Sequence, residues 1–530
     1  MTADIFAWGV ASGDPAPDGV TLWTRVCPTA ALHEGGTCPT AALHEGGIPS
    51  SPTAPGVVDW RVATDPAMRD VVAAGNATAG AATDWTVKVR VRDPALAPAT
   101  TYWYRFAALG VTSGIGRCRT LPDPGAPLPR LRLGYVSCQD FTSGRFHALA
   151  ALADADVDYV IHLGDYIYET VSDPQFQRRG PSDRQLRLPG GGLRAETLED
   201  YRWLYRRYRR DPDLQRLHAR HTVIAIWDDH EFANDGYGVH DIDTLDEQAN
   251  ADPQRRSAAS QAWTEYLPAD VPFDPALPPL EQIRIHRRFV FGNLAELVLT
   301  DERLYRDGPP CGLERAQRYA TRGCAAQADR DRTMLGVPQR QWLVDRLTTS
   351  SRRWKLWGNE TMVMPLRLPG WLAKRLHPHA GDVPMLSDVW VSLDQWDGFQ
   401  AERAMLTDAL VDVDGLVVLT GDLHSFIAGT LRTDDGHAVA TCLMTGSVTS
   451  ANLVEMIAGR TLPSLPLPLT RLVASANPQL DFVNSSAHGF TLLDIDHDRL
   501  RCEMIAVSGV RAPFHFRWRL HTIELPAPAV

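Results

Sequence analysis

The chain has 530 residues, of which 44% are hydrophobic, and it carries a net charge of -11 at pH 7. A chain of this length can bury more than one domain-sized core, and its negative charge argues against a nucleic-acid scaffold or an anionic membrane as the main partner. No apolar run reaches about 18 residues, so we expect no transmembrane segment. The N-terminal stretch MTADIFAWGVASGDP shows no export signal, which leaves either a cytosolic protein or a mature form whose leader has been removed.

Residues 1–125 predict an all-β region with the pattern of a small sandwich. Short apolar runs such as GVTLWTRV, WTVKVRVR and TYWYRFAAL are separated by turns rich in Pro, Gly and Asp. We expect Tyr104 to form a tyrosine corner, and the proline-rich stretch 121–130 to serve as a linker. The decapeptide CPTAALHEGG at 27–36 recurs at 38–47. Two such copies do not make a solenoid, so we interpret them as a duplication within a surface loop.

From residue 131 onward the pattern changes to that of a layered α/β core. Six apolar runs of strand length alternate with helical segments: LRLGYVSC, VDYVIHLGD, TVIAIWDDHE, LAELVLTDER, WKLWGNE and GLVVLTGDLH. Each run is almost continuously hydrophobic, as a strand buried on both faces should be, and each ends in acidic, amide, thiol or histidine residues. Since ligands of open α/β sheets lie outside the carboxyl ends of the strands, we expect these polar endings to converge on one site.

Two further patterns lie within this second region. The stretch EDYRWLYRRYRRDPDLQRLHAR (199–220) predicts an amphipathic helix whose arginines form a solvated face rather than a phosphate or nucleic-acid patch. Cys311 and Cys324 flank a loop rich in Gly and Arg and predict a local disulfide, which would suit an oxidising compartment. Cys138 has no obvious sequence partner and, taken alone, predicts a buried inert thiol.

The polar strand endings together make a set of oxygen, nitrogen and sulfur donors suited to metal ions. The candidates are Cys138, Asp165, Tyr168, Asp228, Asp229, His230, Asn234, Asn359, Asp422 and His424. A single aspartate at a strand end predicts no more than a cap or a turn. A carboxylate that bridges two cations about 3.5–4 Å apart is the standard arrangement of two-metal hydrolases, and the joint occurrence of these donors predicts such a centre.

At these residues the sequence resembles the calcineurin-like metallophosphoesterases and, within them, the alkaline phosphatase D (PhoD) family. The blocks FAWGVASGDPAPDGVTLWTR, VSCQDFTSG, HLGDYIYE, YRRDPDLQRLHA, IWDDHEFANDG, DERLYR, LWGNETMV, DQWDGFQAER and LTGDLHS look like those of the family and stand in its order. The resemblance covers nearly the whole chain. It implies an N-terminal fibronectin-like sandwich at 1–125 and a layered α/β metallophosphoesterase domain, with β-sheets flanked by helices, at 126–530.

The resemblance also implies the ligands of a first metal. Cys138, Asp165, Tyr168 and His424 would hold it, with Tyr168 bound as a phenolate. So many anionic donors beside one imidazole favour a trivalent ion, so we expect Fe³⁺. Asp165 would bridge to the second metal, and His230 would form a hydrogen bond with the substrate phosphate. A ligand role also predicts that Cys138 is in no disulfide.

The second metal site is expected to be built almost entirely from oxygen atoms. Asp229, Asn359 and Asp422 would hold the metal together with the bridging aspartate, and Asn234 and Asp228 are weaker candidate ligands. Oxygen ligands are those that Ca²⁺ prefers, and the resemblance likewise implies iron with calcium.

The function that follows is hydrolysis of phosphate esters, with His230 and Asp165 as the catalytic residues. A hydroxide held between the metals would attack phosphorus, and the metals and His230 would stabilise the charge that develops on the phosphoryl oxygens. We expect a secreted or periplasmic alkaline phosphatase and phosphodiesterase that acts on small or polymeric phosphate esters. The alternatives are a related enzyme with a narrower target, such as a phospholipid, a cell-wall phosphodiester or a phosphotriester, and a non-catalytic calcium-binding surface protein.

Overall fold

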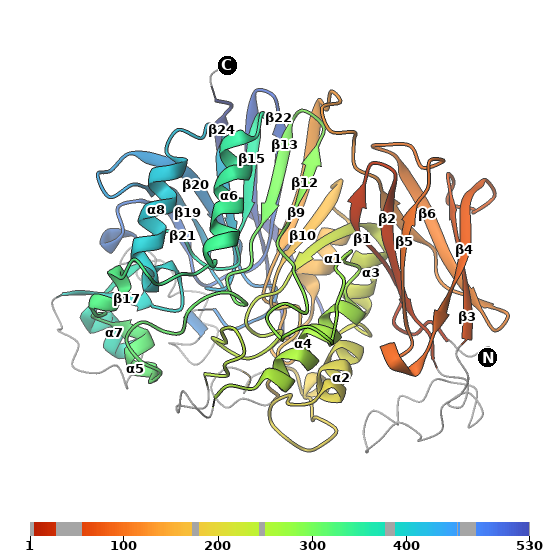
Figure 1. Ribbon diagram of the computed structural model, residues 1–530, viewed down its shortest axis with the longest axis horizontal. Helices are drawn as coiled ribbons and strands as arrows, with labels where there is room; N and C mark the ends of the chain where they lie inside the picture. Colours follow the sequence, from red (N-terminus) through yellow and green to blue (C-terminus); the bar gives the residue numbers. More distant parts are fainter. Residues whose placement is uncertain are drawn as a thin grey trace.

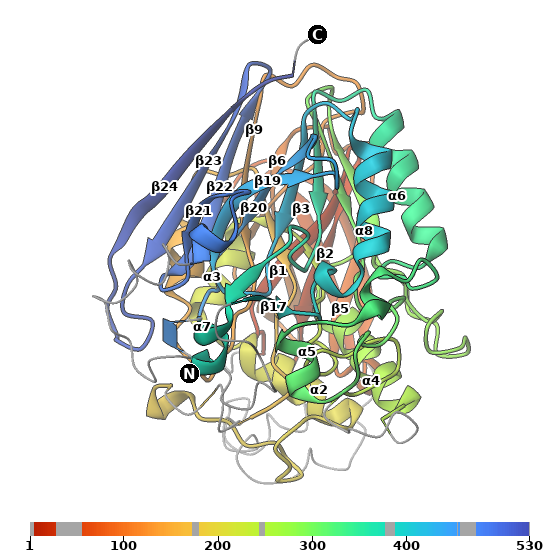
Figure 2. The same cartoon turned by 90° about the vertical axis from the view of Figure 1, so that its left-hand side faces the viewer.

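Two β-sheets packed face to face between helices form the core of the protein, as the computed structural model shows (Figures 1 and 2). The structure describes residues 5–27, 56–171, 177, 180–242, 250–376, 387–452, 454–455 and 473–528. Buried side chains of both sheets, such as Val160 and Leu419, belong to one continuous hydrophobic core. The predicted layered α/β fold is therefore confirmed. The duplicated decapeptide lies, apart from Cys27, outside the described residues.

The larger sheet brings three of the predicted strand ends together. It has nine strands in the order β24-β23-β22-β9-β10-β11-β1-β2-β5. Their bounds are β24 Arg517–Pro526, β23 Arg499–Val507, β22 His488–Asp496, β9 Arg130–Val136, β10 Tyr159–Leu163, β11 Thr222–Ile226, β1 Val10–Ala16, β2 Gly19–Arg25 and β5 Thr86–Arg92. β9, β10 and β11 are parallel neighbours, and every residue of β10 and β11 is buried. Because parallel neighbours finish at one edge, the residues that follow these strands meet there.

The smaller core sheet contributes the other three strand ends. Its seven strands have the order β12-β13-β15-β18-β20-β19-β21. Their bounds are β12 Arg287–Phe291, β13 Ala295–Leu299, β15 Trp354–Gly358, β18 Leu416–Thr420, β20 Ala438–Met444, β19 Phe426–Arg432 and β21 Leu480–Asn484. β13, β15, β18 and β20 run parallel. All six apolar runs are thus strands, as predicted.

Helices cover the outer faces of this double layer. α1 (His147–Ala153) and α3 (Pro212–Arg220) pack on the larger sheet, and α6 (Val337–Thr349) and α8 (Gln400–Leu410) pack on the smaller one. Figure 2 shows α6 and α8 on one side and β22 to β24 on the other. Within the described part of the chain, no helix has the length and apolar character needed to cross a membrane.

The N-terminal region is β-rich, as predicted, and its strands are shared between two sheets. β1, β2 and β5 extend the larger core sheet, whereas β3 (Gly56–Ala63), β4 (Val71–Ala79), β6 (Thr101–Ala108), β7 (Val111–Thr112) and β8 (Gly116–Arg119) form a separate sheet. One sheet of the expected sandwich is therefore an edge of the core.

The corner contact is made by Tyr102, whose hydroxyl accepts a hydrogen bond from the amide of Ala97 at 2.7 Å. The prediction for Tyr104 is wrong, because its buried ring packs on Gly116. The boundary at residue 125 stays a prediction.

The arginine-rich stretch at 199–220 forms two helices rather than one. α2 (Leu198–Tyr208) ends before Asp211, which caps the N-terminus of α3 with Pro212 in its first turn. Arg206 is buried and pairs with Asp84 at 2.6 Å, and Arg209 is buried over the ring of Trp23. The predicted solvated face is wrong at these two arginines, because the N-terminal region covers that side of the helix.

The remaining elements stand around the predicted site. A small sheet has the order β14-β17-β16. The bounds are β14 Tyr319–Thr321, β17 Asp388–Ser392, β16 Arg367–Pro369, α4 Pro253–Tyr266, α5 Arg315–Arg318 and α7 Gly370–Leu376, with 3-10 turns at Ala81–Thr83, Ser182–Arg184, Ala325–Ala328 and Trp396–Gly398. α5, α7 and β17 lie together at the lower left of Figure 1. Cys311 and Cys324 form the predicted disulfide across the segment that holds α5, with 5.7 Å between their Cα atoms.

Candidate metal centre

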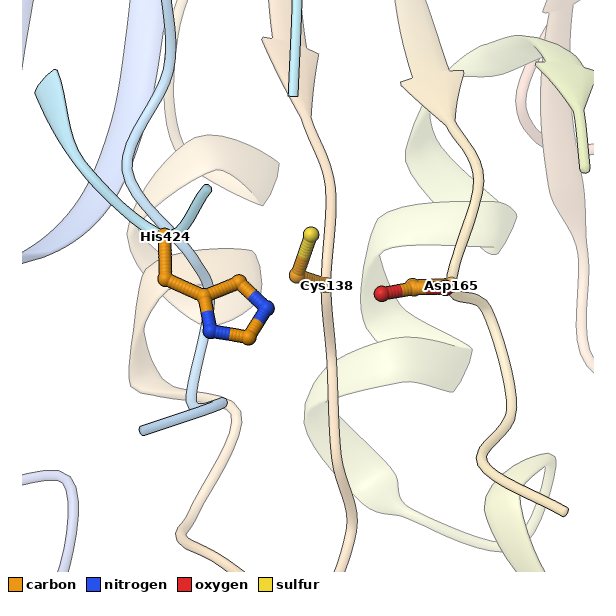
Figure 3. Close-up of side chains that lie close together, drawn as sticks. All are labelled: Cys138, Asp165 and His424. Atoms are coloured by element: carbon orange, nitrogen blue, oxygen red, sulfur yellow. The ribbon is translucent and has the colours of Figure 1, made fainter. Parts of the chain in front are cut away.

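Three candidate ligands from different strand ends lie side by side. Cys138 follows β9, Asp165 follows β10, and His424 follows β18. Their Sγ, carboxylate and imidazole atoms lie within 4.8 Å of one another, and Figure 3 shows the three side chains close together on neighbouring segments. Cys138 is fully buried and is a free thiol. The expected convergence is therefore present for these residues.

The backbone at these positions is held in an unusual conformation. Cys138, Asp165, Asp422 and His424 have φ values of 58°, 56°, 65° and 51°, in the left-handed region that residues other than glycine seldom adopt. Such a conformation costs about 1–3 kcal/mol per residue and persists only where the surroundings hold it. Here the amide of Cys138 donates to the carbonyl of Gly164 at 3.2 Å. Four of the candidate ligands thus share a strained backbone, which is typical of functional sites.

Tyr168 connects two side chains of this cluster, those of Asp165 and His424. Its hydroxyl donates to Asp165 Oδ2 at 2.7 Å, accepts from Ser450 Oγ at 2.6 Å and lies 3.4 Å from His424 Nε2. Burial raises the pKa of Tyr168 well above 10, and the neighbouring Asp165 raises it further. The phenol is therefore neutral unless a strongly charged cation binds beside it.

His424 is prepared to act as a ligand through one nitrogen. Its Nδ1 forms a hydrogen bond with the carbonyl oxygen of Ala451 at 2.7 Å, so Nδ1 carries the proton and Nε2 keeps its lone pair on the side of the cluster. Burial lowers the pKa of His424 to about 4. A neutral imidazole oriented by a carbonyl is the usual form of a metal-binding histidine.

A second group of carboxylates adjoins the first. Asp165, Asp229 and His230 have polar atoms within 4.8 Å of one another, and so do Asp228, Asp229 and Asp422. Burial, with repulsion from Asp229, raises the pKa of Asp422 to about 7. Burial also raises the pKa of Asp165 well above 3.8. Carboxylates that repel one another in a buried site are stabilised by bound cations, so the donor chemistry of both groups fits metal ions.

Arg303, which the sequence analysis did not nominate, lies against this second group. Its side chain is fully buried, with Nε 2.5 Å from Asp228 and Nη1 2.8 Å from Asp394. Its Nη2 lies 3.6 Å from Asp422 and 3.8 Å from Asp229, and has no hydrogen-bond partner among the described residues. Arg303 follows β13 within the block DERLYR, so its position at a predicted strand end was the available signal.

His230 is held by a carboxylate that the sequence analysis also missed. Its Nδ1 lies 2.6 Å from Glu169 Oε2, while Glu169 Oε1 accepts the amide of Asn234 at 2.9 Å. Burial alone would lower the pKa of His230, but the charges of Glu169, Asp229 and Asp165 outweigh it and raise the pKa well above 6.5. In the metal-free protein His230 is therefore a cation, and its Nε2–H remains as a hydrogen-bond donor. Glu169 stands four residues after Asp165, in the block HLGDYIYE.

Glu231 fastens the ends of two strands to each other. Its Oε2 accepts the amides of Asp165 and Asp228, both at 2.9 Å, and its Oε1 accepts the amide of Tyr166 at 2.7 Å. The residues after β10 and β11 are thereby held at a fixed separation. Glu231 follows His230 in the sequence, and nothing in the local pattern distinguished it from a surface acid.

The two asparagines lie in different places. Asn234 lines the same cavity as Asp229 and His230. Asn359 is buried at the end of β15, where its Oδ1 accepts a hydrogen bond from Trp396 Nε1 at 3.0 Å and its Nδ2 donates to the carbonyl of Thr361. The ligand role of each asparagine stays a prediction. The neighbouring Gln395 donates to Asp422.

Comparison with known proteins shows the family of this chain. The family model described as "PhoD-like phosphatase" matches residues 133–504, and "PhoD-like phosphatase, N-terminal domain" matches residues 1–122. Alkaline phosphatase D of Bacillus subtilis (strain 168) is 31% identical over 438 residues, which cover 81% of this chain and 66%, slightly under two thirds, of that protein. A solved structure described as "Structure of PhoD" has a TM-score of 0.80 at 26% identity, covering 99% of this chain and 91% of the other. This chain belongs to the PhoD-like phosphatase family.

Proposed function

We propose that this protein is an alkaline phosphatase and phosphodiesterase that uses Fe³⁺ and Ca²⁺. The observation that carries the proposal is the convergence of a thiol, a carboxylate, a phenol and an imidazole from Cys138, Asp165, Tyr168 and His424. The name of the Bacillus relative, alkaline phosphatase D, supports the same activity.

The residues present fit both ions. Cys138, Asp165, Tyr168 and His424 would hold Fe³⁺, because their anionic donors suit a trivalent ion. Asp165, Asp229 and Asp422 would hold Ca²⁺, with Asn234 and Asn359 as further oxygen donors. Bound in this way, the ions supply positive charge for the phosphoryl oxygens and make water a nucleophile near neutral pH.

His230 has the clearest task among the protein side chains. Because Glu169 holds Nδ1, the Nε2–H is oriented as a donor to a phosphoryl oxygen, where negative charge grows during hydrolysis. In the reaction the ester P–O bond breaks, a P–O bond to the water oxygen forms, and the leaving alkoxide takes up the proton that the water loses. Glu231 and Arg303 would position the ligands rather than touch the substrate. Glu231 holds the backbone of Asp165, and Arg303 lies against Asp229 and Asp422.

We also propose that the protein is secreted or periplasmic. The Cys311–Cys324 disulfide supports this location, since structural disulfides persist in oxidising compartments. Small or polymeric phosphate esters outside the cytoplasm would then be the substrates.

Elemental analysis combined with an activity assay tests the proposal. Purified protein should contain iron and calcium, show a visible charge-transfer band, and release p-nitrophenol from p-nitrophenyl phosphate or its bis ester at alkaline pH. Cys138→Ser should lose iron and activity, whereas Cys442→Ser, which changes another buried free thiol, should keep both. A colourless, iron-free protein with full activity would overturn the iron assignment. Unchanged turnover in Asp165→Asn would overturn the two-metal site.

A further inference from the structure

The cavity that contains the candidate ligands has a second, apolar part. The whole cavity has a volume of about 160 Å³. Asp229, His230, Asp422 and His424 are among its polar lining residues. The same cavity is also lined by aliphatic side chains, called here the apolar wing, from the smaller core sheet, the small sheet and the segment before β21: Leu366, Leu368, Val391, Ile427, Val473 and Val483. None of these six side chains can form a hydrogen bond. Ser392, Ser425 and Ser485 line the cavity as well.

The walls of the apolar wing are firmly held. Ile427 of β19 pairs with Val483 of β21, and the amide of Val391 donates to the carbonyl of Leu366 at 3.1 Å. Asn477 donates from its side-chain amide to the carbonyls of Arg367 and Val473, at 2.8 and 2.7 Å. Leu368 and Ile427 are each only 2% exposed. The apolar wing is therefore a preformed recess, which needs no rearrangement to accept a ligand.

The apolar wing adjoins the metal centre directly. One short segment carries Asp422 and His424 at the centre and Ile427 in the wall. A phosphate ester whose phosphoryl group lies at the metal centre beside His230 would thus place a substituent beside aliphatic carbon. Against these six aliphatic side chains, a hydroxyl or a charge would lose its hydrogen bonds to water without replacement.

We propose that the apolar wing binds an apolar substituent, an alkyl chain or an aryl ring, of the phosphate ester that this enzyme hydrolyses. The volume of about 160 Å³ belongs to the whole cavity, which must also hold the phosphoryl group, so the substituent is a short chain or a single ring. The inference rests on the proposed phosphoesterase function and specifies its substrate class. Esters of polyols, such as glycerol, are disfavoured by the same walls.

A homologous series of alkyl phosphates tests this inference. Methyl, ethyl, propyl and butyl phosphate release alcohols of similar basicity, so differences in kcat/KM report binding of the chain. With the metal-loaded enzyme, kcat/KM should rise about fourfold for each added methylene and then level off when the recess is full. Propyl phosphate should be a better substrate than glycerol 1-phosphate, which has the same number of carbons.

Substitutions in the recess provide a second measurement. Val391→Phe fills the apolar wing, so the ratio of kcat/KM for butyl and methyl phosphate should fall towards one. Leu366→Ala enlarges it, so the series should level off at a longer chain. Val337→Phe, on the exposed start of α6, should leave the ratio unchanged. Equal kcat/KM along the series in an active enzyme would overturn the inference alone, whereas absence of hydrolysis of every ester would overturn the proposed function.

Discussion

The buried guanidinium beside the second carboxylate group gives the sharpest prediction. Arg303→Met removes a positive charge that contacts Asp228 and Asp394 and lies within 4 Å of Asp229 and Asp422. We expect the metal-free variant to be much less stable than the parent protein, and bound calcium to restore part of that loss.

The magnitude follows from the distances. At an effective dielectric constant of 20, unit charges about 4 Å apart interact by about 4 kcal/mol, and the separations from Arg303 Nη2 are 3.6 Å to Asp422 and 3.8 Å to Asp229. Removing one partner of a buried ion pair costs about 3–5 kcal/mol. The same arginine repels a cation bound to these aspartates. Its removal should therefore raise calcium affinity by tenfold or more. The loss of stability caused by Arg303→Met should then be about 1.4 kcal/mol smaller in saturating calcium than in the metal-free protein.

The assay is urea unfolding in a chelator and in saturating calcium, together with calcium titration by calorimetry. Arg306→Met is the matched control, because Arg306 is equally buried and pairs with Asp394 but not with Asp229 or Asp422. In the chelator, both variants should unfold at lower urea concentrations than the parent protein. Calcium should reduce this loss of stability only for Arg303→Met. If Arg303→Met were destabilised relative to the parent protein by the same amount in chelator and in saturating calcium, the reasoning would be refuted.

Four other predictions follow from the structure. Because Asp422 has a pKa of about 7 without metal, calcium should bind up to tenfold more weakly for each pH unit below 7. Calcium titrations at pH 6 and 8 measure this difference. The calcium affinity of Asp422→Asn should not depend on pH in this way. The same proton makes the metal-free protein less stable as pH rises from about 4 to 7, since the folded state binds more protons than the unfolded chain in that window. Glu169→Gln removes the charge that raises the pKa of His230, so the alkaline limb of the kcat/KM profile should move to lower pH, and an unchanged limb would contradict a protonated His230. Cys311→Ser, which opens a disulfide of sequence separation 13, should cost about 3 kcal/mol of stability with metal content unchanged, and loss of metal would show that the disulfide supports the site.

The strands and much of the candidate site could be predicted because their signals are local. A strand buried on both faces must be apolar along its whole length, so the six runs from LRLGYVSC to GLVVLTGDLH were visible without any knowledge of their neighbours. The polar residues that end these runs were visible for the same reason, among them Cys138, Asp165 and His424. The Cys311–Cys324 disulfide was also a local pattern.

The charges that hold the site could not be predicted in this way. Arg303 meets Asp228 and Asp394 across 75 and 91 residues of sequence, and Arg206 meets Asp84 across 122. In a sequence, such an arginine has the same pattern as one on a solvated surface, which is why the solvated face predicted at 199–220 was wrong at Arg206 and Arg209.

The sequence by itself determined which residues form buried strands and which donors stand at their ends. Only the tertiary structure decided that β1, β2 and β5 extend the core sheet, and that Glu169, Glu231 and Arg303 support the candidate ligands. The physical reason is that a charged side chain can be buried only where distant partners neutralise it, and sheet order and packing, rather than local sequence, place those partners.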